Sequence, residues 1–192
     1  MLQVYEKLIT NSQGNDFPLS PSEEVTPIRL THWKNSRMAL AACLKEANLC
    51  KEDVLHSDLV IDHHHKLKAF PDFIVSLSHT RGAAAAMLTR QTKAMLGVGI
   101  DIEEQTRTIK EGVIEKYAHP QDSGLDPLHL WCAKEAAFKA SSFFWNREKT
   151  FILKDIKVID HSFWVDDLLS GEVIHHYEEG YLITKAFVLS LN

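Results

Sequence analysis

The sequence predicts an α+β protein in two parts, each of which combines a helix with strands. In the first part, helical spacing of apolar residues over 28–47 is followed by two short strand-like runs between residues 73 and 88. In the second part, Asp126-Pro127 marks the start of a helix, and the chain after this helix alternates like a β meander. A further strand, over 97–103, lies between the two helical stretches. Together these observations indicate the α+β class.

The composition is that of an ordinary globular protein. The chain has 192 residues, 45% of them hydrophobic and 24% charged, which is enough for one sizeable core or two packed halves. The formal net charge of -5 argues against wholesale nucleic-acid binding and against a polybasic membrane surface. An anionic partner would therefore need a local basic patch.

The three cysteines, Cys43, Cys50 and Cys132, are odd in number and lack zinc-ligand spacing, which indicates reduced thiols in a cytoplasm. The N-terminus shows no basic region followed by an apolar one. No apolar run approaches the roughly 18 to 20 residues that span a bilayer. We therefore expect a soluble cytoplasmic protein without a membrane segment.

The N-terminal region is rich in turn residues before the first helix. Within residues 11–27, the segment Ser20-Pro21-Ser22-Glu23 has the shape of a capping box with proline at the first helical position. From 28 to 47 the pattern is helical, with Trp33 among the apolar positions and Arg37 among the polar ones.

Three adjacent histidines, His63-His64-His65, lie in a polar segment over 62–68 that we expect to be a loop. Neighbouring residues on an extended chain point alternately to opposite sides, so these imidazoles do not converge as metal ligands without special backbone geometry. We expect structural or solvent-facing roles for them.

The segment Gly97-Val98-Gly99-Ile100-Asp101-Ile102-Glu103 is predicted to be a strand with two different faces. Because side chains alternate, the three β-branched residues face one side, and Asp101 and Glu103 face the other. Two acids beside glycines that leave the backbone approachable make a plausible seat for a hard cation and a phosphate. Taken alone, the same pattern also fits a solvated strand end.

Further elements follow along the second part. A short helix is predicted over 110–117, stopped by His119-Pro120, and a longer one over 126–142, capped by Asp126. The predicted strands of the meander cover residues 151–159, 162–169, 171–177 and 181–189, with a turn at Glu179-Gly180.

The longer helix carries a third candidate carboxylate. Glu135 and Lys139 are four residues apart and share a face, with Trp131 one turn earlier. By themselves they also fit an ordinary surface pair. Together with Asp101 and Glu103, Glu135 would complete an oxygen cluster of the kind that holds magnesium.

The predicted strands 73–78 and 83–88 are joined by His79-Thr80-Arg81-Gly82. Ser78 and His79 at the end of the first strand, followed by an arginine, bring hydroxyl, imidazole and guanidinium to one loop. All three groups suit phosphate oxygens. By itself, His79 also fits an ordinary loop histidine.

Three motifs occur in one order: Ser76-Leu77-Ser78-His79-Thr80-Arg81-Gly82, then the 97–103 strand, then Trp131-Cys132-Ala133-Lys134-Glu135-Ala136-Ala137-Phe138-Lys139. In this order they resemble the 4'-phosphopantetheinyl transferase superfamily. The chain is similar to its larger, monomeric, surfactin-synthetase-associated class, which serves fatty-acid, polyketide and nonribosomal peptide synthesis. The resemblance implies two similar α/β halves packed about a pseudo-twofold axis as one compact unit. The nucleotide side of coenzyme A would belong to residues 1–96 and the metal-binding carboxylates to residues 97–192.

The resemblance also implies a reaction. A holo-[acyl-carrier-protein] synthase type of enzyme moves 4'-phosphopantetheine from coenzyme A to a serine of an apo acyl or peptidyl carrier protein and releases 3',5'-ADP. By resemblance, Asp101, Glu103 and Glu135 would hold Mg²⁺ on the pyrophosphate, and Lys139 would contact that phosphate. The general base would be Glu135 itself or a water that it orients.

The nucleotide contacts follow from the same resemblance. Ser78 and His79 would lie on the 3'-phosphate side, and Arg37 matches an arginine of the family's first long helix that reaches the same phosphate. Where the family usually carries Gly-Lys-Pro against the nucleotide, this chain has Lys66-Leu67-Lys68-Ala69-Phe70-Pro71. After the third motif it carries Phe143-Phe144-Trp145, which fits either core packing or the lining of a pantetheine channel.

Two other functions stay open. One is a non-enzymatic coenzyme A-binding relative that keeps the fold without productive carrier docking. The other is a metal-dependent nucleotide phosphohydrolase that uses the same three carboxylates. Modification of a carrier protein distinguishes a transferase from both, because binding or hydrolysis transfers nothing to a protein.

Overall fold

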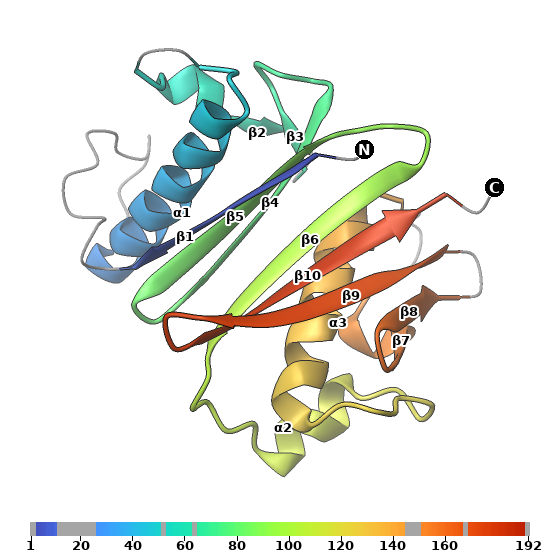
Figure 1. Cartoon of the computed structure of the whole chain (residues 1–192). Helices are drawn as coiled ribbons and strands as arrows, with labels where there is room; N and C mark the ends of the chain where they lie inside the picture. Colours follow the sequence, from blue (N-terminus) through green and yellow to red (C-terminus); the bar gives the residue numbers. More distant parts are fainter. Residues whose placement is uncertain are drawn as a thin grey trace. The chain divides into compact units, whose positions relative to one another are not determined.

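A computed structural model describes residues 3–10, 26–50, 53–62, 65–144, 151–166 and 169–190. The predicted capping box at Ser20-Pro21-Ser22-Glu23, two of the three adjacent histidines (His63 and His64) and Trp145 lie outside these residues. Contacts divide the chain into two units, Met1–Arg90 and Gln91–Asn192. Each unit contains a five-stranded antiparallel sheet and at least one helix (Figure 1), which confirms the predicted α+β class.

The first unit is a sheet with the strand order β1-β5-β4-β3-β2, against which helix α1 packs. Its elements are β1 (Val4–Thr10), α1 (Pro27–Glu46), the 3-10 helix η1 (His56–Leu59), β2 (Ile61–Asp62), β3 (Lys66–Leu67), β4 (Phe73–Thr80) and β5 (Ala83–Arg90). The predicted strands over 73–78 and 83–88 are confirmed as β4 and β5, a hairpin with Gly82 at φ 85° in its turn. Strand β1 was not predicted. All seven of its residues are half-buried, so it lacks a clear alternation of apolar and polar positions.

Helix α1 begins at Pro27, where the side chain of Thr26 accepts a hydrogen bond from the backbone N–H of Arg29 (3.4 Å). Its inner face carries fully buried small and aliphatic residues such as Leu40 and Leu44. Ala86 and Leu88 of β5 are buried in the same core cluster as this face, and the small side chain of Ala86 lets the helix lie close to the strand. This packing presents the N-terminal turns of α1 to the end of β4.

The prediction of a loop over 62–68 is wrong at Asp62 and at Lys66–Leu67, because these residues pair as the short strands β2 and β3. Leu67 is fully buried, and the carbonyl of His65 accepts a hydrogen bond from the N–H of Val75 in β4 (2.7 Å). His65 itself is buried, which agrees with the structural role expected for it. Pairing with β4, a non-local contact, therefore overrides the polar local composition.

The second unit is a sheet with the strand order β6-β10-β9-β8-β7, and α3 lies across one face of it (Figure 1). Its elements are β6 (Met95–Glu104), α2 (Glu111–Tyr117), α3 (Pro127–Ser141), the 3-10 helices η2 (Ser142–Phe144) and η3 (Leu153–Asp155), β7 (Ile156–Ile159), β8 (Ser162–Val165), β9 (Leu169–Glu178) and β10 (Tyr181–Leu189). The predicted helices and the turn at Glu179-Gly180 are confirmed, with positive φ at both turn residues. Among the described residues, no helix is long and apolar enough to cross a membrane.

The predicted first strand of the meander is too long at its start. Residues 153–155 turn as η3 instead, because the Asp155 carboxylate accepts a hydrogen bond from the N–H of Ile152 (3.0 Å) and closes a turn before Ile156.

The contact between α3 and β6 depends on two glycines. A Cβ atom placed on Gly99 would lie 1.8 Å from the Ala136 carbonyl oxygen, and one on Gly97 would lie 2.2 Å from the Ala140 carbonyl oxygen. The helix backbone therefore rests directly on the strand. The expectation that these glycines leave the backbone open to a ligand is wrong, because α3 covers them.

Candidate functional site

The acidic face of β6 meets the second half of α3. Lys139 Nζ lies 2.8 Å from Asp101 Oδ1 and donates a second hydrogen bond to the Ile100 carbonyl oxygen (2.9 Å). The Asp101 side chain is 7% exposed and that of Lys139 is 27% exposed. The close approach of helix and strand at Gly99 thus brings a cation and a carboxylate, both predicted as site residues, into direct contact at the edge of the core.

Glu135 belongs to the same group of charges. Burial raises the pKa of its carboxyl above the ordinary value, and the neighbouring charge of Asp101 raises it further, whereas Lys139 and Arg107 lower it. Asp101 and Glu135 are therefore close enough to repel one another. Two carboxyl groups at one partly buried site favour either a cation bound between them or a proton kept on one of them.

Glu103 is buried and forms an ion pair with Arg107, whose guanidinium also lies 5.3 Å from the centre of the Trp131 ring. Arg107 was not predicted as a site residue. It lies in a turn just beyond the end of β6, and the presence of an arginine there does not by itself predict that it pairs with Glu103.

The donor set fits a hard divalent cation by its chemistry. Asp101, Glu103 and Glu135 offer carboxylate oxygens alone, which are the ligands that Mg²⁺ prefers. Within the described ranges, no three acidic, histidine or cysteine side chains are already arranged as a metal site. Binding of an ion by all three would therefore require Glu103 to exchange Arg107 for the metal.

A separate cavity of about 450 Å³ lies in the first unit, between α1 and the end of β4. Its lining consists of Arg29, His32, Trp33, Ser36 and Arg37 from α1 and Leu77 and His79 from β4. Two arginines and two histidines line this cavity, and none of its lining residues is acidic. The cavity is therefore suited to an anion.

The cavity brings together two predicted nucleotide contacts, Arg37 and His79. The guanidinium of Arg37 lies 5.7 Å from the centre of the Trp33 ring, and burial lowers the pKa of this arginine from its ordinary value. Ser78 is buried and is not among the lining residues, since alternation along β4 turns it away from His79. Sequence reasoning missed Arg29 and His32, because an exposed turn of a helix does not reveal which strand end it will face.

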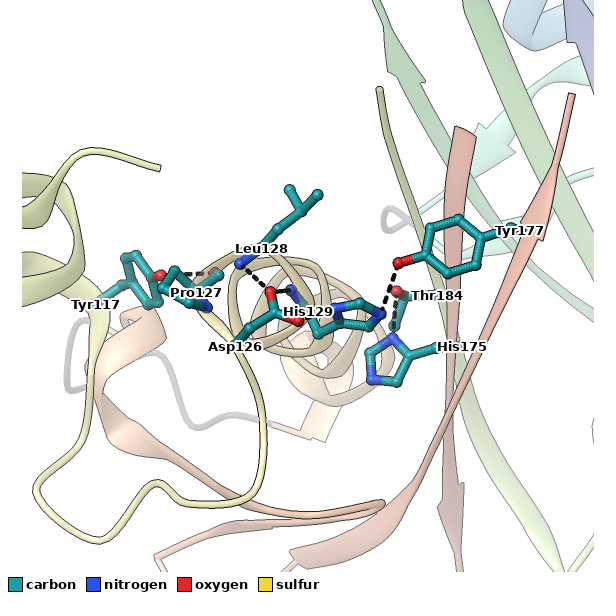
Figure 2. Close-up of polar contacts among 8 residues, drawn as sticks. All are labelled: Tyr117, Asp126, Pro127, Leu128, His129, His175, Tyr177 and Thr184. Atoms are coloured by element: carbon teal, nitrogen blue, oxygen red, sulfur yellow. Dashed lines mark hydrogen bonds and ion pairs between the residues drawn. The ribbon is translucent and has the colours of Figure 1, made fainter. Parts of the chain in front are cut away.

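A hydrogen-bond network ties the start of α3 to the sheet, and Figure 2 shows its members. The Asp126 carboxylate caps the helix and also lies 2.5 Å from His129 Nδ1. On its other side, His129 Nε2 lies 3.1 Å from the Tyr177 hydroxyl of β9 (Figure 2). His175 Nδ1 lies 2.8 Å from the Thr184 hydroxyl and packs edge-on to the His129 ring. These contacts fix the helix that carries Glu135 and Lys139.

The other lysine of the third motif has a different role. Lys134 is fully buried and forms an ion pair with Asp122 at 2.9 Å. It also donates hydrogen bonds to the carbonyl oxygens of Ile156 and Leu153. Adjacent residues of a helix point about 100° apart, so Lys134 enters the core while Glu135 faces β6. This ion pair sets the rotation of α3 about its axis.

Part of the second unit matches a known protein family. Residues 97–186 match the sequence model of the family described as ACPS, the 4'-phosphopantetheinyl transferase superfamily. A comparison with curated proteins gave no match. The matched segment contains the β6 carboxylates and the α3 residues Glu135 and Lys139. The resemblance is thereby confirmed at the level of the superfamily: residues 97–186 form a domain of the 4'-phosphopantetheinyl transferase superfamily.

Proposed function

We propose that this protein transfers 4'-phosphopantetheine from coenzyme A to a serine of an apo carrier protein, with Mg²⁺, and releases 3',5'-ADP. A domain of this superfamily supports phosphopantetheine transfer in general. The observation that carries the specific proposal is the group formed by Lys139, Asp101 and Glu135, where a cation lies beside two mutually repelling acids. Such a group suits a metal-bound pyrophosphate and a proton acceptor.

The metal would be held by the three carboxylates. Asp101, Glu103 and Glu135 are its proposed ligands, and when bound the ion would neutralise charge on the pyrophosphate oxygens. Lys139 would donate hydrogen bonds to the phosphate oxygens that gain charge as the reaction proceeds.

The proton of the attacking serine would pass to Glu135 or to a water that Glu135 orients. Its raised pKa makes Glu135 a better proton acceptor than an exposed glutamate. The serine oxygen forms a bond to the phosphorus that bears pantetheine, and the bond from that phosphorus to the bridging oxygen breaks. The electron pair leaves with 3',5'-ADP, and Lys139 stabilises the charge that develops on the oxygens.

The nucleotide end of coenzyme A is assigned to the cavity of the first unit. Arg37 and His79 would bind the 3'-phosphate, and Trp33 offers an aromatic surface in the same cavity. Ser78 is buried and does not line the cavity, so we propose that it stabilises the end of β4 without contacting the phosphate.

The acceptor would be an apo acyl or peptidyl carrier protein of fatty-acid, polyketide or nonribosomal peptide synthesis, and the enzyme would act as a monomer of the larger class. A carrier with an acidic helix would require a local basic or apolar docking patch on this acidic chain.

Intact-mass analysis of an apo carrier protein incubated with this protein, coenzyme A and Mg²⁺ tests the proposal. We expect the carrier to gain the mass of one phosphopantetheinyl group, and EDTA to abolish the gain. Glu135→Gln should lower the rate by about 10²- to 10⁴-fold, whereas Glu172→Gln, the same change at an exposed position of β9, should not. Coenzyme A binding without any gain on several carriers would support the non-enzymatic relative. Loss of phosphate from the nucleotide without a gain on the carrier would support the phosphohydrolase.

A further inference from the structure

Two imidazole rings face one another in the cavity of the first unit. The ring centres of His32, on α1, and His79, at the end of β4, lie 4.5 Å apart with an angle of 39° between the ring planes. Both residues line the cavity. The family resemblance implied a role for His79 and none for His32, and the structure brings the two rings together.

The charged side chains that line the cavity beside the pair are positive. Arg29 and Arg37 reach the cavity from α1, and the residue of β5 paired with His79 is Ala84, which carries no charge. From η1, His56 stacks on Trp33 at 6.2 Å between ring centres and does not line the cavity. Both imidazoles and both guanidinium groups can therefore donate hydrogen bonds to one anion in this cavity.

We propose that His32 and His79 together bind a phosphate monoester and take up a proton when it binds. This inference rests on the proposed function, because the phosphate would be the 3'-phosphate of coenzyme A. A phosphate with nearly two negative charges at neutral pH favours the charged imidazolium form of both rings, each of which can donate a hydrogen bond to it. One proton from solvent joins an imidazole nitrogen, and no bond of the ligand changes.

If the histidine pair takes up a proton, the affinity for the phosphate falls as the pH rises. Where a full proton is taken up on binding, the association constant falls about tenfold for each unit that the pH rises. If Arg29 and Arg37 alone held the phosphate, the affinity would be nearly constant above the second pKa of the phosphate, at about 6. Proton uptake near pH 7 to 8 therefore separates the histidine pair from an arginine site.

Calorimetric titration of the full chain with 3',5'-ADP, coenzyme A and dephospho-coenzyme A tests this inference. Each titration is run near neutral pH in two phosphate-free buffers of different ionisation enthalpy, such as PIPES and Tris, so that the difference in heat gives the protons taken up. We expect uptake approaching one proton for 3',5'-ADP and coenzyme A and little for dephospho-coenzyme A. The absence of uptake with a ligand that carries the 3'-phosphate would overturn the inference.

Two variants locate the proton. His32→Gln should remove most of the proton uptake and weaken the binding of 3',5'-ADP, while the affinity for dephospho-coenzyme A stays unchanged. His79→Gln should behave in the same way. His56→Gln, a histidine that touches Trp33 outside the cavity, should retain full uptake. Full uptake in His32→Gln would contradict a pair.

The inference and the proposed function fail in different ways. Carrier modification together with binding of coenzyme A that involves no proton overturns the histidine pair alone. Failure of coenzyme A and 3',5'-ADP to bind at all would overturn both.

Discussion

Lys139 of α3 and Asp101 of β6 are 38 residues apart in the chain, and their charged atoms lie 2.8 Å apart. This pair connects the second and third motifs in space, because α3 lies directly on the glycines that precede Asp101. It also leaves a partly exposed ammonium beside a nearly buried carboxylate. The consequences of this arrangement can be measured.

Removing the lysine should affect chemistry more than folding. We expect Lys139→Ala to lower the rate of carrier modification by about 10²- to 10³-fold, the usual loss for one donor to a transition-state oxygen. Asp101 would lose a charged partner, so the free energy of unfolding should fall by about 1 to 3 kcal/mol. Initial rates by mass spectrometry and urea unfolding measure the two effects. Lys154→Ala, an exposed lysine of η3, is the control, and an unchanged rate for Lys139→Ala would contradict the assignment.

The ion pair between Arg107 and Glu103 should compete with a metal. Because the pair is partly exposed, its removal in Arg107→Ala should tighten Mn²⁺ binding in the presence of coenzyme A by about two- to fivefold. Titration of free Mn²⁺ by electron paramagnetic resonance measures this affinity directly. Arg90→Ala, an arginine that lies over Phe73 in the first unit, should leave it unchanged. Weaker Mn²⁺ binding in Arg107→Ala would show that the arginine does not compete with the ion.

The contact at Gly99 should tolerate no side chain. In Gly99→Ala the new methyl group meets the backbone of Ala136, so α3 must shift. We expect the free energy of unfolding to fall by about 3 kcal/mol, the upper end of the usual range for overpacking, and activity to fall with it as Lys139 moves from Asp101. Gly112→Ala in α2, where nothing lies within 4 Å, is the matched control and should be neutral or stabilise by up to about 1 kcal/mol. Equal stability of the two variants in urea unfolding would contradict this account of the contact.

The buried pair of Lys134 and Asp122 should matter for stability. Asp122 also accepts hydrogen bonds from the N–H groups of His119 and Val158, at 2.6 Å and 2.8 Å. Asp122→Ala therefore breaks the pair and leaves two backbone donors, and we expect it to cost about 3 to 5 kcal/mol. Lys134→Met keeps the volume of the side chain and those backbone bonds, so it should cost less. Denaturant unfolding measures the loss of unfolding free energy in both variants. A larger loss for Lys134→Met than for Asp122→Ala would contradict this expectation.

The stability of the second unit should fall in mild acid because of His175. Burial lowers the pKa of His175 to about 4, with further lowering by His129 and His161. In the unfolded chain a histidine has a pKa of about 6.5, so between these values the unfolded state binds more protons. The titration of this residue therefore does not change the stability above about pH 6.5. Below it, stability is lost progressively as the pH falls toward about 4.

The free energy of unfolding, measured in urea over this pH range, checks that expectation. His175→Gln should show a shallower decline than the unchanged protein, because the carboxylates that also titrate are common to both. Parallel curves for His175→Gln and the unchanged protein would contradict the assigned cause.

Much of the second unit could be predicted from local pattern. The Asp126 cap with Pro127, the alternation in β6 and the turn at Glu179-Gly180 each depend on neighbours in sequence, and each is found in the structure. The order of the three motifs likewise predicted the superfamily that the comparison supports. These features follow from residue types at short spacing.

Other features depend on partners far away in the chain. Strand β1 has no clear period and forms by pairing with β5, and the β2–β3 hairpin forms beside β4. Arg107 gains its role from Glu103 and Trp131 together, and His32 gains its role from the end of β4. Local composition cannot reveal these contacts, because each one needs two elements to be packed first.

The sequence by itself determined the locally encoded elements, such as α3 and β6, and which residue types could bind a metal and a phosphate, since capping, alternation and side-chain chemistry are local properties. The tertiary structure alone decided that the glycines of β6 serve helix packing and that Asp101 meets Lys139. It also decided that two histidines share one cavity. The physical reason is that close packing of a helix on a strand fixes distances between side chains that no spacing along the chain encodes.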